Sequence, residues 1–257
     1  MSPAYPRELG RAFQDAEVAR NYRYRQPYPP EVFEMLEGLL VEPRTVLDAG
    51  SGTGALTIGL ARFAKRVDAL DPSEAMLGEA RRLPGADSER IRWTLGTAES
   101  APLDPPYGLI ATGASIHWMV PEIVMPRFRK SLAPEAVLAI VNSESTFAQQ
   151  EWHAELVSLI RRYSPSSQHL EFAELVRSLE SSGRFVRAGE RTAAAVPYEQ
   201  SLHDYLTMLA STSSLSRTTL GAHSDDFARE ARAISARHGV TTVRAELVAQ
   251  VIWGRPQ

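Results

Sequence analysis

The chain has 257 residues, of which 44% are hydrophobic and 23% are charged, and its formal net charge is −3. These values are typical of a soluble globular protein, and the small charge predicts neither a nucleic-acid partner nor binding to an anionic membrane. The chain has no cysteine, which excludes disulfides, thiolate metal ligands and a cysteine nucleophile. No signal-peptide pattern and no membrane-spanning apolar run is visible, so we expect a cytoplasmic protein, a monomer or homodimer.

The first 30 residues are polar and aromatic, and three prolines lie between Arg25 and Glu31. Phe13, Ala16 and Ala19 could line one face of a helix, and residues 25–30 are then expected to be extended or turning, because proline interrupts helices. Apolar residues at helical spacing then predict a helix over residues 31–40.

A glycine-rich turn follows the first predicted strand, which covers residues 45–48. Glycines at alternate positions, 50, 52 and 54, lead into a helical pattern. Because glycine has no Cβ, such a turn can adopt positive φ and a ligand can approach its main chain closely. The spacing differs from the dinucleotide pattern G-x-G-x-x-G. The carboxylate of Asp48 would repel a pyrophosphate, but it suits a ligand that carries an ammonium group.

This stretch resembles motif I of class I S-adenosylmethionine (SAM)-dependent methyltransferases, whose cofactor has an amino-acid tail and no phosphate. A glycine-rich turn that binds nothing is the alternative. The resemblance implies that one group of residues contacts SAM: Asp48, Gly50, Ser51, Gly52 and Gly54.

A second strand is predicted over residues 66–71, and it ends in Asp71. In a βαβ unit, an acid at this position faces a ribose and can accept both hydroxyl hydrogens. Asp71 followed by Pro72 is also typical of a helix start with Asp71 as the N-cap, and the two roles are compatible. Residues 71–77 follow the pattern D-x-S-x-x-M-L, which resembles a motif of the same family. The resemblance implies that Pro72 and Met76 also lie at SAM, with Met76 near the adenine. An ordinary core methionine is the alternative.

A third strand is predicted over residues 91–96, and Thr97, Ala98 and Glu99 follow it. The resemblance implies that this turn offers a backbone N–H and a carboxylate to the adenine. A solvent-exposed loop acid is the alternative. Residues 104–107, Asp-Pro-Pro-Tyr, resemble the catalytic motif of methyltransferases that act on nucleic-acid amino groups. That motif ends the fourth strand, whereas here the fourth strand, over residues 109–113, comes after it. We therefore predict a turn without a catalytic role.

The residues after the fourth strand, 114–118, resemble the A-x-x-H-W motif of the small-molecule branch of the family, the ubiquinone-biosynthesis-like and trans-aconitate-methyltransferase-like enzymes. This implies that Ala114 lies at SAM and that His117 and Trp118 face the substrate. Imidazole is the side chain best suited to proton transfer near neutral pH, so His117 can act as a general base. Alternatively, it only packs or forms hydrogen bonds.

The N-terminal arm is similar to a family segment, F-x-x-x-A-x-x-Y-x-x-x-R-P-x-Y-P, that closes over SAM, although Gln26 separates Arg25 from Pro27 here. The resemblance implies a lid in which Tyr22 reaches the cofactor and Tyr28 the substrate. A plain packing arm is the alternative.

The rest of the chain carries no motif that we can translate into chemistry. Its apolar patterns predict a fifth strand over residues 137–141, two amphipathic helices within 145–185 and a sixth strand over 191–198. Two further helices are expected, over about 200–210 and 224–239. Apolar residues at every second position over residues 243–253, with neighbours that are mostly polar, predict a final antiparallel strand.

Together these patterns predict an α/β fold: a Rossmann-like seven-stranded, mostly parallel sheet with helices on both faces, an antiparallel last strand and a helical lid between strands 5 and 6. We divide this single methyltransferase domain into an N-terminal lid arm (1–30), a SAM-binding core (31–144), a helical substrate lid (145–190) and the completion of the sheet (191–257).

The expected reaction moves a methyl group from SAM to an oxygen, nitrogen or carbon of a small molecule and leaves S-adenosylhomocysteine. The residues leave open a protein that binds SAM without catalysis, as a sensor or partner. We expect no metal, because no Asp/His cluster has convincing ligand spacing.

Overall fold

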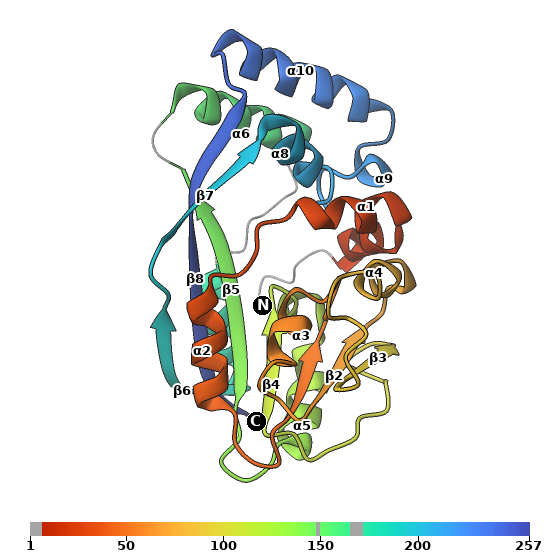
Figure 1. The fold of residues 1–257 in the computed structure, drawn as a ribbon, viewed down its shortest axis with the longest axis vertical. Helices are drawn as coiled ribbons and strands as arrows, with labels where there is room; N and C mark the ends of the chain where they lie inside the picture. Colours follow the sequence, from red (N-terminus) through yellow and green to blue (C-terminus); the bar gives the residue numbers. More distant parts are fainter. Residues whose placement is uncertain (1–6, 148–149, 165–171) are drawn as a thin grey trace.

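The computed structural model describes residues 7–147, 150–164 and 172–257. Its eight described strands form one sheet in the order β3-β2-β1-β4-β5-β8-β6, and β7 pairs with β8 (Figure 1). Neighbours among β1 to β5 are parallel, whereas β8 is antiparallel to β5, β6 and β7. The strands are β1 (Thr45–Ala49), β2 (Arg66–Asp71), β3 (Ile91–Leu95), β4 (Leu109–Gly113), β5 (Leu138–Thr146), β6 (Phe185–Thr192), β7 (Val196–Ser201) and β8 (Thr242–Pro256).

Helices pack on both faces of this sheet because its strands are apolar on both sides. Val46 and Leu47 are neighbours in β1, yet they belong to different buried clusters, since successive strand residues point to opposite faces. One cluster includes side chains of α2 (Pro30–Leu39) and α3 (Ala55–Leu60), and the other includes side chains of α5 (Pro121–Ser131) and α7 (Phe172–Ser181). A further helix, α4 (Glu74–Ala80), lies between β2 and β3 in the chain. The expected fold class is confirmed.

A third apolar cluster lies beyond the parallel strands, where β5 and β8 extend past them (Figure 1). Its helices are α6 (Glu151–Tyr163), α8 (Leu202–Leu209), α9 (Arg217–Leu220) and α10 (Ser224–Arg237). We call these four helices together with β7 the cap, and the rest of the sheet with α2 to α5 and α7 the core. The two helices expected between strands 5 and 6 therefore separate, because α6 packs in the cap whereas α7 packs on the core.

The expected strand over residues 191–198 is wrong. The chain forms β6 up to Thr192 and a separate β7 from Val196, so the sheet has one strand more than the seven expected. The residue between them, Ala193, is buried and donates its N–H to the carbonyl of Ala249. The two strands lie along the same edge of β8, β7 beside its first half and β6 beside its second half. An apolar pattern that crosses such a break cannot show where one strand ends.

The N-terminal arm lies between α4 and the cap (Figure 1). It consists of η1 (Arg7–Gln14), α1 (Ala16–Asn21) and η2 (Tyr22–Tyr24). On the core side, the hydroxyl of Ser73 donates to the carbonyl of Phe13 at 2.6 Å. On the cap side, the hydroxyl of Thr218 donates to the carboxylate of Asp15 at 2.5 Å, which holds the pKa of Asp15 below its ordinary value. The arm is therefore fastened to both halves of the molecule.

Candidate cofactor-binding site

The carboxyl ends of β1 to β4 meet at one edge of the sheet because these strands are parallel. Hydrogen bonds between the loops hold this edge together. The N–H groups of Gly50 and Ser51 both donate to the carbonyl of Leu70, at 2.8 and 3.0 Å. The hydroxyl of Ser115, after β4, donates to the carbonyl of Ala49 at 2.6 Å. With the bond from the Gly96 N–H to the carbonyl of Asp71 at 3.0 Å, these contacts join the loops after four strands into one continuous rim.

The glycine turn after β1 has positive φ at all three glycines, 76° at Gly50, 54° at Gly52 and 84° at Gly54. A Cβ on Gly50 would come within 2.4 Å of the Ser115 side chain, and a Cβ on Gly54 within 2.6 Å of Trp93. A Cβ on Gly52 would meet nothing within 4 Å. The outer glycines therefore pack closely against neighbours, and Gly52 leaves its space open to a ligand.

Asp71 ends β2 and fixes the glycine turn in place. One carboxylate oxygen accepts the N–H of Gly52 at 2.8 Å and the other accepts the N–H of Ser73 at 2.8 Å. Burial raises its pKa, and the two backbone donors oppose that rise. The expected role of Asp71 as N-cap of α4 is wrong, because the helix begins at Glu74 and Ser73 caps it by accepting the N–H of Met76.

The loop after β3 is held against α5 from two sides. A carboxylate oxygen of Glu99 accepts the N–H of Val120 at 2.8 Å. The guanidinium of Arg127 donates to the carbonyls of Ala98 and Ala101, at 3.0 and 2.6 Å. These contacts fix the backbone that carries Thr97, Ala98 and Glu99.

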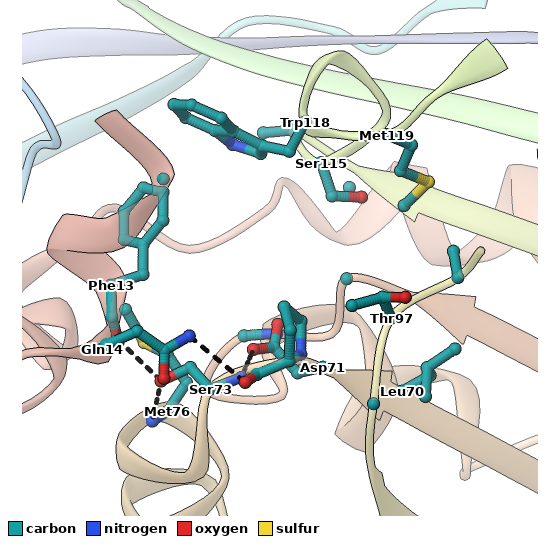
Figure 2. A pocket seen from close by; sticks show the side chains of 18 of the residues that line it. Phe13, Gln14, Leu70, Asp71, Ser73, Met76, Thr97, Ser115, Trp118 and Met119 are labelled. Atoms are coloured by element: carbon teal, nitrogen blue, oxygen red, sulfur yellow. Dashed lines mark hydrogen bonds between the residues drawn. The ribbon is translucent and has the colours of Figure 1, made fainter. Parts of the chain in front are cut away.

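A cavity of about 300 Å³ lies between this rim and the N-terminal arm. Figure 2 shows Phe13 and Trp118 on the side of the cavity opposite Asp71 and Leu70. The structure brings most of the predicted site residues together around it: Tyr22, Gly50, Gly52, Asp71, Pro72, Met76, Thr97, Ala98, Glu99, Ala114 and Trp118. One of them, Ala114, has a φ of 48°, an unusual value for a residue with a side chain.

Five predicted residues lie outside the lining of this cavity: Tyr28, Asp48, Ser51, Gly54 and His117. Asp48 is only 1% exposed and accepts the hydroxyl of Thr57 at 2.5 Å. Burial, opposed by this hydrogen bond and reinforced by the charge of Asp71, raises the pKa of Asp48 to about 7. Asp48 therefore lies beneath the glycine turn and does not line the cavity. This differs from our expectation that its carboxylate faces the ligand directly.

Tyr28 and His117 lie close to the cavity without lining it. The Tyr28 hydroxyl occupies the space that a Cβ on Gly113 would take, 2.6 Å away, and burial together with the charge of Asp48 raises the pKa of Tyr28. His117 sits in the turn η3 (Ile116–Trp118), with its ring centroid 4.7 Å from that of Trp118. Their substrate contacts stay predictions.

The Asp-Pro-Pro-Tyr stretch stabilises a loop before β4, as expected. The carboxylate of Asp104 pairs with Arg66 and Arg92, at 2.8 and 2.9 Å. Tyr107 is 1% exposed and donates its hydroxyl to Asp68 at 2.8 Å. This loop makes none of the cavity lining.

Sequence reasoning missed ten residues of the lining: Gly10, Arg11, Phe13, Gln14, Leu70, Ser73, Gly96, Gly113, Ser115 and Met119. The first four belong to η1, whose contacts with the loop after β2 join residues about 60 positions apart and are not visible in the local sequence. The others are neighbours in the chain of residues that were predicted. A broader window around each strand end would have included them.

Within residues 7–147, 150–164 and 172–257, no three histidine, aspartate or glutamate side chains gather where they could hold a metal ion. Across the same three stretches, no helix has the length and apolarity needed to cross a bilayer.

Comparison with known proteins gives results of three kinds. Residues 46–135 match the family model described as a methyltransferase domain. An uncharacterized methyltransferase of Mycobacterium tuberculosis is 35% identical over 136 residues. Those residues are 52% of this chain, and they span about half, 53%, of the length of that curated relative.

Solved structures extend the likeness over nearly the whole chain. A candidate type II methyltransferase from Anaeromyxobacter dehalogenans superposes with a TM-score of 0.66 and 25% identity, over 90% of this chain and 97% of that chain. A SAM-dependent methyltransferase from Geobacter sulfurreducens, in complex with S-adenosylhomocysteine, superposes with a TM-score of 0.50 and 21% identity, over 96% and 98% of the two chains.

The fold is therefore the one found in these methyltransferase structures. The domain match and the relative named as a methyltransferase support the prediction of an enzyme.

Proposed function

We propose that this chain moves the methyl group of SAM to a small-molecule nucleophile by in-line displacement. One observation carries the proposal: the glycine turn, Asp71 and the loop 97–99 line a single cavity at the carboxyl ends of parallel strands. Ligands of open α/β sheets bind at this edge. The similarity of residues 46–135 to methyltransferase domains supports the same conclusion.

The donors and acceptors of the cavity fit SAM. Each carboxylate oxygen of Asp71 accepts one backbone N–H and keeps a lone pair, so Asp71 can still accept the two ribose hydroxyls. Glu99 uses one oxygen on Val120 and can accept the adenine amino group with its remaining lone pairs. Met76 offers an apolar surface to the adenine, and the open space at Gly52 leaves room for the amino-acid tail.

SAM supplies a methyl group bonded to a sulfonium. The methyl carbon accepts the electron pair of the nucleophile while the carbon–sulfur bond breaks, and S-adenosylhomocysteine, a neutral thioether, leaves. This chain has to hold the nucleophile in line and to exclude water. The N-terminal arm, fastened to core and cap, covers the cavity for that purpose. An alcohol or ammonium must also lose a proton, for which His117 is our candidate acceptor, whereas a carboxylate needs no base.

We further propose that the acceptor belongs to the small molecules methylated by the ubiquinone-biosynthesis-like and trans-aconitate-methyltransferase-like branch. The A-x-x-H-W residues support this proposal, because Ala114 and Trp118 both line the cavity. The net charge of −3 provides no attraction for nucleic acid.

Calorimetry with SAM, S-adenosylhomocysteine and NAD tests the cofactor, and labelled SAM with a panel of hydroxyl, amine and carboxylate metabolites tests the transfer. We expect SAM and S-adenosylhomocysteine to bind and label to appear in a panel member. Tight NAD binding without SAM binding would overturn the proposal. SAM binding without transfer across a broad panel would favour the non-catalytic sensor.

A further inference from the structure

A second cavity, which we call the arm–cap cavity, lies between the N-terminal arm and the cap and has a volume of about 770 Å³. The arm, α8 and α10 each line it with one face, because their lining residues recur at every third or fourth position, as Glu17, Asn21 and Tyr24 do in the arm. The arm–cap cavity has no described lining residue in common with the cavity at Asp71, which we call the cofactor cavity. It is therefore a separate place where a ligand can bind.

The floor of the arm–cap cavity is apolar. Leu215, Phe227 and Ala231 line it, and all three are buried members of the apolar cluster that holds the cap together. Leu206 of α8 lines the same floor and packs against this cluster. A ligand with an apolar body gains here by leaving water, which is the main favourable contribution in pockets of this kind.

The polar groups of the lining differ in whether they already have a partner. The guanidinium of Arg217 lies 2.9 Å from the carboxylate of Asp225 and 4.0 Å from that of Glu17, so both acids of the lining are paired. The side chains of Arg232, on α10, and Asn21, on the arm, form neither a hydrogen bond nor an ion pair with any residue that the structure describes. The donors that remain for a ligand are thus a guanidinium and an amide, which suit a carboxylate.

The N-terminal arm contributes to both cavities. Tyr22 lines the cofactor cavity, whereas its neighbours Asn21 and Tyr24 line the arm–cap cavity. A ligand that contacts both the arm and the cap stabilises the docked position of the arm. The same position of the arm completes the wall of the cofactor cavity.

We propose that the arm–cap cavity binds a small molecule with an apolar body and a carboxylate, and that this ligand strengthens binding in the cofactor cavity. The apolar body lies on the floor, and Arg232 pairs with the carboxylate. Because coupling between two binding sites is reciprocal, a ligand in the cofactor cavity strengthens binding in the arm–cap cavity by the same factor. The coupling rests on the proposed function, whereas the site itself does not.

Calorimetry with diphenylacetate and with its uncharged amide, diphenylacetamide, tests the site. The two probes share one apolar body, and only diphenylacetate is charged. We expect diphenylacetate to bind about tenfold more tightly, as a hydrogen bond to a charged group implies. Arg232→Gln should abolish this preference. The matched control is Arg229→Gln in the same helix, because Arg229 pairs with Asp226 outside the lining, and it should keep the preference.

Ala228→Phe places a ring in the arm–cap cavity and should weaken the binding of both probes. Absence of diphenylacetate binding, equal affinities of the two probes, or an unchanged preference in Arg232→Gln would overturn the site.

Titration of diphenylacetate with and without saturating S-adenosylhomocysteine tests the coupling. We expect S-adenosylhomocysteine to strengthen diphenylacetate binding about threefold, at the lower end of ordinary coupling between sites. Unchanged binding would overturn the coupling. Weaker binding would mean that the probe occupies the cofactor cavity, which would overturn the inference as a whole. If neither SAM nor S-adenosylhomocysteine binds, the proposed function and the coupling fail, whereas binding of diphenylacetate through Arg232 still supports the site.

Discussion

Strands β5 and β8 of the core extend as far as the cap, yet the core and the cap position their residues by different means. In the core, the candidate site consists largely of strand ends and turns, whose backbone groups bond to one another and to Asp71. In the cap, α6, α8 and α10 are held by an apolar cluster and by exposed ion pairs such as Arg237 with Glu155. A site that is built from main chain constrains the residue types in the sequence, whereas side-chain packing leaves many sequences equally suitable.

Among substitutions that test this difference between core and cap, Asp71→Ala should have the largest effect on SAM affinity. The change removes the acceptor of the Gly52 and Ser73 N–H groups and the proposed ribose acceptor. We expect about 100-fold weaker SAM binding, which corresponds to about 2–3 kcal/mol for lost hydrogen bonds to a charged group. Calorimetry gives the affinity, and thermal unfolding gives the melting temperature.

Asp104→Ala is the control for Asp71→Ala, because its exposed carboxylate pairs with Arg66 and Arg92 and lies outside the lining of the cavity. It should leave SAM binding unchanged. If Asp71→Ala lowers the melting temperature but keeps the affinity, the role of Asp71 is confined to holding the turn.

A second expected effect concerns the buried carboxylate of Asp48. Its pKa is raised to about 7 in the folded chain and is near 3.9 when unfolded, so its contribution to stability is fully present below about pH 4 and is lost as the pH rises through 7. The difference in free energy of unfolding, Asp48→Asn minus wild type, should therefore rise by about 2 kcal/mol from pH 5 to pH 8, because only the wild type loses stability over this range.

Urea unfolding at several pH values measures this difference without any ligand. Glu199→Gln in the cap is the control, because Glu199 forms an exposed pair with Arg244 and should give a nearly flat difference. A flat difference for Asp48→Asn as well would mean that water reaches this carboxylate.

A tenfold effect is expected from Arg127→Ala, which removes one of the two contacts that hold the loop 97–101 against α5. The two carbonyls that Arg127 holds then lose their charged donor, and the proposed adenine contacts become less ordered. SAM affinity should fall about tenfold, or about 1.4 kcal/mol. Arg129→Ala, in the same helix but bonded to Gln257, should have no effect on binding. Identical affinities for the two variants would show that the loop holds its position without Arg127.

The smallest effect should come from Arg25→Ala, which disconnects the arm from Ser211 in the cap. We expect about threefold weaker SAM binding with little change in the melting temperature, because the arm keeps its bonds to Ser73 and Thr218. Arg23→Ala is the neighbouring control, since its guanidinium lies over Tyr24. A loss as large as that of Asp71→Ala would mean that the cap contributes to the cofactor site as strongly as the core does.

The parallel strands could be predicted from the sequence because each is a short apolar run that ends in a turn residue. Gly52, Asp71 and Glu99 could be placed near one cavity for the same reason, since parallel strands bring their carboxyl ends together. The sequence does not show that Asp48 lies under the glycine turn, because a side chain near the end of a strand can point either under the turn or toward a ligand. Phe13 and Gln14 were missed because their contacts with Ser73 and Pro72 join residues about 60 positions apart, which a local pattern does not show.

Strand β8 has a consequence for the order in which the chain folds. It pairs with β5 on one side and with β7 and β6 on the other, although about 100 residues separate it from β5. During synthesis the edge of β5 that pairs with β8 therefore stays unpaired until residues 242–256 have left the ribosome. Pairings between such distant segments close slowly, and an open edge strand is prone to join another chain. Assembly of both halves of this protein thus depends on the arrival of one late strand.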